Sequence, residues 1–144
     1  MTLSQRINQI VLAMSGYDFT FLHADKPEQN LGDDVTGDIA YLDFPIESAD
    51  TLHKTGAITA EYEIKILFAR KSELEWTTDQ HETDCIEPMR TAARKFITAL
   101  QNDNEIKSVI SSRRLDVKNI FDANMSGCIA TIKLIVMDAN AICV

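Results

Sequence analysis

Apolar residues recur at two different spacings along the chain, and the spacing distinguishes helices from strands. A helical stripe near the start consists of Leu3, Ile7, Ile10, Val11 and Met14. Thr2, followed three residues later by Gln5, predicts a capping box at the beginning of this helix. Gly16 is expected to end it, because glycine tolerates the left-handed conformation at a helix end.

The clearest strand covers residues 58–70, where apolar and polar residues alternate over a long run. One face of this strand is predicted to be buried and the other solvated. Shorter strands are expected at residues 18–24 and 38–46, and Pro45 in the second marks a bend or a sheet edge. Between them, residues 25–37 are rich in Asp, Asn, Gly and Pro and predict a loop, which we expect to be mobile.

A second amphipathic helix is predicted by the apolar residues Ile86, Met89, Ala93, Phe96, Ile97 and Leu100. Asp84 and Glu87 form an Asp-x-x-Glu start signal, and Pro88 lies in the first turn, where its missing N–H costs little. Residues 77–83 fit either an earlier helical turn or a polar loop. Asn102 and the polar residues after it are expected to end the helix.

The last third of the chain predicts a β-hairpin. Its first strand contains Leu115 and Val117, its turn spans residues 123–127, and its second strand covers residues 128–138. Both faces of the second strand are mostly apolar, which predicts a central strand covered on both sides. Residues 106–114 fit helix or strand equally well. The weakly apolar tail, residues 139–144, is expected to dock either on the domain or on a neighbour.

The order α-β-β-β-α-β-β predicts an α+β fold, with a mainly antiparallel sheet of about four to five strands and two helices packed on it. A length of 144 residues is typical of one domain, so residues 1–144 are expected to form a single unit.

Composition narrows the function mainly by exclusion. With 45% hydrophobic and 25% charged residues, the chain is an ordinary globular protein, and no apolar run reaches the roughly 20 residues of a membrane helix. The net charge of −8 argues against a protein that grips nucleic acid phosphates. An acidic chain can still line a channel through which DNA passes without sticking. The densest basic cluster, Arg90, Arg94 and Lys95, is interpreted as a solvated helix face.

The three cysteines, Cys85, Cys128 and Cys143, form no spacing motif, which favours reduced thiols in a cytoplasm. The polar N-terminal segment lacks the apolar core of a signal peptide, and this agrees with the same compartment.

Candidate chemistry is sparse. His81 and Cys85 have the spacing of two metal ligands on a helix, but no further ligands accompany them, so a structural role is favoured. Glu61 and Glu63 share a strand face with Lys65, which favours surface pairing over acid–base catalysis. We therefore predict no catalytic residue, no metal and no cofactor, and expect that the protein is not an enzyme.

Two features are candidates for contacts with other subunits. Asp33, Asp34, Asp38 and Asp43 form an acidic cluster that is either a solvated loop or a mobile loop facing a neighbouring subunit or a lumen. Trp76 follows the long strand and marks either an interface or the margin of the core.

The layout as a whole resembles a known family. An amphipathic N-terminal helix is followed by the alternating strand at residues 58–70, by the helix that includes Met89 and Phe96, and by the segment Ile-Phe-Asp-Ala-Asn-Met-Ser-Gly at residues 120–127 before an apolar strand. This order, which covers most of the chain, is similar to that of the tail terminator and tail-completion (neck) proteins of tailed bacteriophages and prophages.

The resemblance implies a virion structural protein that forms a ring, often six-fold, at the junction of head and tail. Such a ring caps the tail tube, docks the head connector and lets DNA pass through its lumen; its subunits wait in the bacterial cytoplasm before assembly. Ring contacts need two different faces on each subunit. The candidates are a sheet edge and the 25–37 loop, with Asp33, Asp34, Asp38 and Trp76 as interface or lumen residues.

Two alternatives remain open at this point. One is a ligand-binding or enzymatic α+β domain with its pocket between the sheet and the helices. The other is an adaptor that binds another protein as a monomer or dimer. A ring protein is expected to have symmetry above two-fold, whereas an adaptor need not.

Overall fold

The computed structural model describes residues 2–25, 37–44, 46–54, 58–73, 75–120 and 125–136. In chain order the elements are α1 (Leu3–Leu12), β1 (Thr20–Asp25), β2 (Ile39–Phe44), β3 (Glu47–Leu52), β4 (Ile58–Lys71), α2 (Thr78–His81), the π-helical turn η3 (Glu82–Ile86), α3 (Glu87–Gln101), β5 (Ile106–Ile120) and β6 (Met125–Val136).

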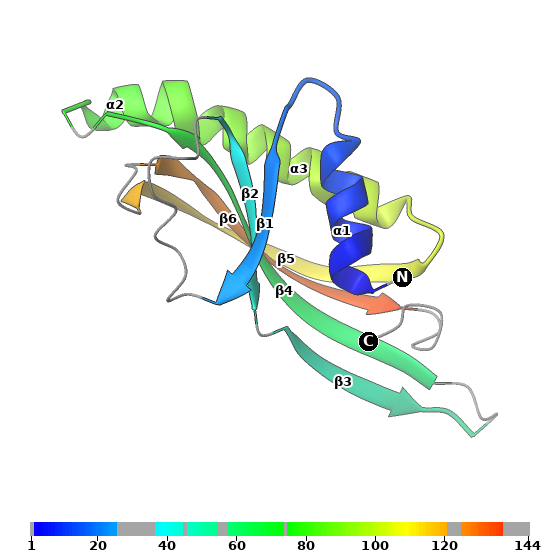
Figure 1. Ribbon diagram of the computed structural model, residues 1–144. Coiled ribbons are helices and arrows are strands. Elements are labelled where there is room, and N and C mark those ends of the chain that lie inside the picture. The colour runs from blue at the N-terminus through cyan, green and yellow to red at the C-terminus, as the bar shows by residue number, and fades with distance from the viewer. Residues whose placement is uncertain are drawn as a thin grey trace.

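The strands form one sheet in the order β1-β2-β4-β6-β5, and β3 pairs with the first half of β4 on the same side as β2. All pairs are antiparallel except β1 with β2. The two long helices, α1 and α3, lie over the same face of this sheet (Figure 1). The predicted α+β class, with two helices on a mainly antiparallel sheet, is confirmed.

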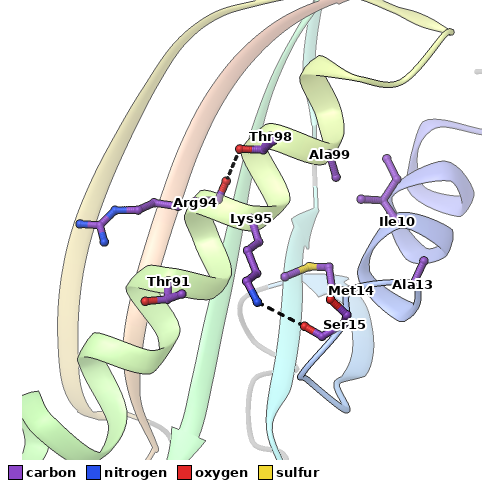
Figure 2. Close-up of a pocket in the computed structure, with 9 residues that line it drawn as sticks. All are labelled: Ile10, Ala13, Met14, Ser15, Thr91, Arg94, Lys95, Thr98 and Ala99. Atoms are coloured by element: carbon purple, nitrogen blue, oxygen red, sulfur yellow. Dashed lines mark hydrogen bonds between the residues drawn. The ribbon is translucent and has the colours of Figure 1, made fainter.

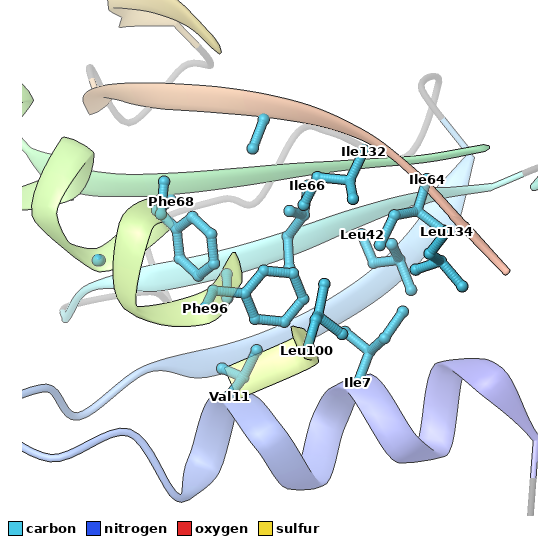
Figure 3. Close-up of a cluster of buried hydrophobic side chains, with 14 of the residues drawn as sticks. Ile7, Val11, Leu42, Ile64, Ile66, Phe68, Phe96, Leu100, Ile132 and Leu134 are labelled. Atoms are coloured by element: carbon cyan, nitrogen blue, oxygen red, sulfur yellow. The ribbon is translucent and has the colours of Figure 1, made fainter. Parts of the chain in front are cut away.

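The main core lies between the sheet and the two helices (Figure 3). Alternate residues of β4, such as Ile64 and Phe68, and alternate residues of β6, such as Ile132, supply its sheet side. The Phe68 ring lies 5.5 Å from the Phe96 ring of α3. Aromatic and aliphatic burial of this kind stabilises by about 1.5–3 kcal/mol per side chain, so these contacts hold α3 on the sheet.

A second, smaller cluster lies on the opposite face of the sheet. Its buried members are Ile39, Tyr41, Leu67, Ala69 and Met125. The burial of the β4 face that was predicted to be solvated therefore varies along the strand. Glu61 and Glu63 are half-buried and Lys65 is exposed, whereas Leu67 and Ala69, nearer the end of the strand, are buried.

The N-terminal helix forms as the sequence predicts. The Thr2 hydroxyl accepts a hydrogen bond from the Gln5 backbone N–H, and the Gln5 side chain accepts one from the Thr2 backbone N–H. Gly16 follows the helix with φ of +84°, the left-handed region that favours glycine. Arg6 reaches the residues after α3 and donates from Nε to Asp103 Oδ2 at 2.7 Å.

The strand β3 was not predicted. All six of its side chains are exposed, so no alternation of apolar and polar residues marks it. The strand expected at residues 38–46 corresponds to β2, which ends at Phe44. The chain then forms β3 as a separate strand, which pairs with β4. The strand expected at residues 18–24 is β1, displaced by one or two residues.

Residues 77–83, which fitted an earlier helical turn or a polar loop, form the helical turn, so the second helix begins before the Asp84–Glu87 signal. Thr77 and Gln80 form the capping box that starts α2, and the helical backbone then continues without a break. Ile86 has helical torsions, so the Asp84–Glu87 signal does not mark the start of a helix. A cause of the π-helical turn is Pro88, which has no N–H to bond the Asp84 carbonyl. The Arg70 guanidinium donates to that carbonyl instead, at 3.3 Å.

The hairpin is longer than predicted. Residues 106–114 are strand throughout, as part of β5. β6 begins at Met125, so Ser126 and Gly127 belong to the strand rather than to the turn. β6 lies between β4 and β5, as expected for a central strand, but the expected cover on both faces is incomplete: Ile129 and Ile135 are half-buried and Lys133 is exposed. Most of the 25–37 loop and the tail at 139–144 lie outside the described residues.

Candidate functional site

The strand β5 forms one open edge of the sheet. It pairs with β6 on one side and, among the described residues, with no strand on the other. It pairs along the 12 residues of β6, so at about 3.3 Å per residue this edge is about 40 Å long. Because an unpaired edge offers a row of free backbone N–H and C=O groups, it is a template for pairing with another chain.

The β5 edge also exposes apolar side chains. Leu115 is 63% exposed and Ile110 is 49% exposed. Irregular pairing interrupts the ladder near Val109 and after Val117, whereas residues 111–117 pair with β6 in a regular register. The regular stretch is therefore the part of the edge best suited to accept a further strand.

The opposite edge is made by two shorter strands. β1 pairs with β2 alone, and β3 pairs with β4 alone, within the part of the chain that the structure describes. Leu52 at the end of β3 is 76% exposed. The two edges of the sheet therefore differ in length, in strand direction and in sequence.

A set of hydrogen bonds from α3 fixes the position of β5. The Arg90 guanidinium donates to both carboxylate oxygens of Asp116 on β5 and, at 2.8 Å, to Glu87. These bonds hold the pKa of the Asp116 carboxyl below its usual range and raise the pKa of Arg90. Arg90, Arg94, Arg114 and Asp116 line a polar cleft of about 270 Å³ beside the pair.

The residues predicted from the sequence have separate environments. Asp38 accepts two hydrogen bonds from the Arg70 guanidinium, each at 3.0 Å, so its carboxylate is engaged within the subunit. Trp76 is half-buried and meets the His81 ring edge-on at 5.7 Å. Asp33 and Asp34 lie outside the described residues.

A buried polar cluster joins β6 to the helical segment. Ser126 Oγ lies 2.9 Å from Ser72 Oγ and 3.1 Å from His81 Nδ1. A serine beside a histidine is also the pairing of a nucleophile with its base. Here all three side chains are at most 4% exposed, so no substrate reaches the hydroxyl. The cluster therefore satisfies polar groups inside the fold.

The His81–Cys85 spacing does not lead to a metal site in the described part of the chain, where no three His, Cys, Asp or Glu side chains gather. The Cys85 thiol lies 3.5 Å from the Lys71 carbonyl, and burial raises the pKa of the thiol. Glu61 and Glu63 remain on the outer sheet face, where Glu63 pairs in register with Lys133.

An apolar groove of about 570 Å³ lies between α1 and α3 (Figure 2). Ile10, Ala13 and Met14 of the α1 region form one wall. The hydroxyls of Thr91 and Thr98 on the other wall donate to carbonyls of their own helix. These two threonines therefore make the groove less polar than their type suggests.

Lys95 crosses one end of the same groove. Its Nζ lies 3.4 Å from the Ser15 carbonyl oxygen and 5.3 Å from the centre of the Tyr17 ring. The ammonium group is thus partly engaged by the subunit itself.

No protein-family model matches the chain, and no curated protein is similar to it in sequence. None of the helices within the described residues has the length and apolar content needed to cross a bilayer. The sheet edges and the groove are the features of the fold that bear on its function.

Sequence reasoning named a sheet edge as a candidate interface without identifying its strands. A signal for β5 was present, because residues 106–117 include the β-branched residues Ile106, Val109, Ile110 and Val117. For β3 the sequence offered no comparable signal.

Proposed function

We propose that this protein is a virion structural protein of a tailed bacteriophage or prophage and forms a ring at the head–tail junction. The ring ends the tail tube, offers the head connector a docking surface and lets DNA pass through its lumen. The proposal originates in the layout of the elements, which resembles that of tail terminator and neck proteins. One structural observation supports it: within the described residues the sheet has two unpaired edges that differ from each other.

Unlike edges favour a particular kind of assembly. A contact between two copies of the same surface gives a closed dimer, whereas a contact between two different surfaces gives a ring or a filament. In this fold β5 forms one surface, and β3 and β1 form the other, at the far side of the sheet. Each subunit can therefore contact two neighbours at once.

The overall charge is compatible with a channel for DNA. A net charge of −8 on each subunit repels DNA phosphates, which keeps DNA free to move. The same charge also keeps the subunits soluble before they assemble.

Light scattering behind a sizing column, over a concentration series of the purified full chain, tests this proposal. We expect a closed species near six subunits, or a shift towards one as the concentration rises, and a central hole in electron micrographs. A strict monomer at every concentration would contradict it.

A second experiment tests the place of the ring in the virion. In the phage or prophage that encodes the chain, loss of the protein is expected to leave separate heads and tails. Normal particles in the absence of the protein would contradict the assignment to the junction.

A second candidate, a small ligand-binding or adaptor domain, is favoured by the groove between α1 and α3. Its volume of about 570 Å³ lies within the range of small-molecule sites. The space between the sheet and the helices, where a pocket was expected, is filled by the main core. Ala13→Arg would fill the groove, so a monomer whose ligand binding is abolished by this substitution would support this candidate.

A further inference from the structure

The charges of the chain separate onto the two edges of the sheet. β5 contains four Lys or Arg residues and one acidic residue, a net charge of +3 on a chain of −8. β1, β2 and β3 together contain four acidic residues and no Lys or Arg. Since β5 ends one side of the sheet and β1 and β3 end the other, a basic edge faces away from an acidic edge.

The basic charges of β5 include two consecutive arginines. Arg113 and Arg114 are both exposed, and their side chains lie on opposite faces of the sheet because they are neighbours in a strand. Neither forms a salt bridge with a described residue, whereas Arg90 and Asp116 nearby engage each other. Arg114 also lines the polar cleft beside Asp116 and helps to lower the pKa of that carboxyl, so it is partly engaged within the subunit. The edge therefore presents one cation on each face of the sheet, Arg113 on one and Arg114 on the other.

The acidic charges of β3 are similarly exposed. Glu47 and Asp50 are exposed, lie on opposite faces of the sheet, and form no salt bridge within the part of the chain that the structure describes. Leu52, at the end of the same strand, exposes a large apolar surface. The β3 edge thus exposes both carboxylates and an apolar side chain. The β5 edge likewise exposes guanidinium groups together with Leu115.

We infer that the basic β5 edge of one copy docks against the acidic β3 edge of a second copy, so that subunits join head to tail. This inference deepens the proposed ring function and rests on it. Backbone hydrogen bonds between the two edge strands supply part of the affinity. The opposite charges of the two edges select the partner edge and speed the encounter.

The same charges oppose the two symmetric alternatives. Two β5 edges would bring together two surfaces of +3, and two β3 edges would bring together Glu47 and Asp50 of both copies. Like charges across an interface disfavour the wrong pairing, which is how specificity is commonly achieved. Head-to-tail contact is the arrangement that leaves no such repulsion at these edges.

The test uses two charge-reversal variants of the full chain. Arg113→Glu with Arg114→Glu makes the β5 edge acidic, and Glu47→Lys with Asp50→Lys makes the β3 edge basic. These side chains are exposed and lack salt bridges among the described residues, so both variants are expected to fold normally. The matched control, Lys65→Glu with Lys71→Glu, makes the same charge change as the arginine variant at exposed positions of β4, away from the two edge strands.

The expected result is measured as the concentration at which half of the protein is assembled, by light scattering or sedimentation. Each reversal variant alone should raise this concentration by about 100-fold or more, because like charges then face each other. The control should stay close to the wild-type protein. Assembly of the wild-type protein should also weaken as NaCl is raised, because salt screens exposed charges.

Mixing the two reversal variants is the decisive step. The acidic β5 edge of the first then matches the basic β3 edge of the second, and the remaining two edges also have opposite charges. An equimolar mixture should therefore assemble in alternation, although neither variant assembles alone.

The outcomes separate this inference from the proposed function. Wild-type rings that neither reversal weakens would overturn the inference and leave the ring function standing. Association that the reversals abolish and mixing restores, but that yields open chains without a closed ring, would support the inference and contradict the ring. No association of the wild-type protein at any concentration would overturn both.

Discussion

Gly127 lies in β6 where an added side chain would meet the backbone of β4, and its replacement by alanine is expected to destabilise the fold strongly. In β6 it pairs with Ala69 of β4 on one side and with Val117 of β5 on the other. A Cβ atom added here would overlap the Phe68 carbonyl oxygen and lie 2.8 Å from the Ala69 Cα. Both are backbone atoms, so the strands themselves must separate to admit the methyl group.

The cost follows from the hydrogen bonds that flank this pair. Leaving two buried backbone groups unsatisfied costs about 1–3 kcal/mol each, so Gly127→Ala is expected to remove roughly 2–6 kcal/mol. That is a large part of the typical stability of about 5–15 kcal/mol. At about 3–4 °C per kcal/mol for a chain of this size, Tm should fall by roughly 6–24 °C.

Guanidinium unfolding followed by far-ultraviolet circular dichroism and by the fluorescence of Trp76, the sole tryptophan, measures the free energy of unfolding. Gly37→Ala is the matched control, since its Cβ would meet nothing within 4 Å and its φ lies outside the left-handed region. Such a substitution is neutral or stabilises by about 0.4–1 kcal/mol. A Gly127→Ala protein within about 1 kcal/mol of the wild type would refute the close approach of β4 and β6.

Three further predictions concern the core, one ion pair and the thiols. Phe96→Ala should lower the free energy of unfolding by about 3–5 kcal/mol in the same assay, because Phe96 is fully buried. Arg90 lowers the pKa of Asp116, so the stabilisation by this carboxylate is present at neutral pH and is lost as the pH falls through the lowered pKa. The difference in Tm between the wild-type protein and Asp116→Asn should therefore shrink between pH 7 and pH 3. A constant difference would contradict this. Burial raises the pKa of the Cys85 and Cys128 thiols. Peptide mass spectrometry should therefore find both cysteines unlabelled by iodoacetamide at pH 8 in the folded protein and labelled in denaturant. Rapid labelling of the folded protein would count against their burial.

The elements that sequence could predict are those that bury one face. β4 and α1 carry a regular apolar period because one side of each packs on the main core. β3 buries neither face, so it left no pattern. The helix start was misplaced because Asp84 and Glu87 imitate a capping box inside a helix that Thr77 had already begun.

The candidate interface was only partly predictable for a different reason. Glu47 and Arg113 are far apart in the sequence, and nothing local indicates that they lie at opposite edges of one sheet. That relation depends on the strand order, in which β4 and β6 separate the two edges. The four basic residues of β5 lie within residues 107–118, but the strand order is needed to show that they line an edge of the sheet.

Hydrogen exchange measured by mass spectrometry at low and high protein concentration tests the two-edge contact most directly. The unpaired amides of β5 and β3 should exchange quickly in dilute protein and become protected together as the protein assembles, while α1 and α3 stay unchanged. Protection confined to the walls of the groove between α1 and α3, or no change with concentration, would contradict assembly through the sheet edges.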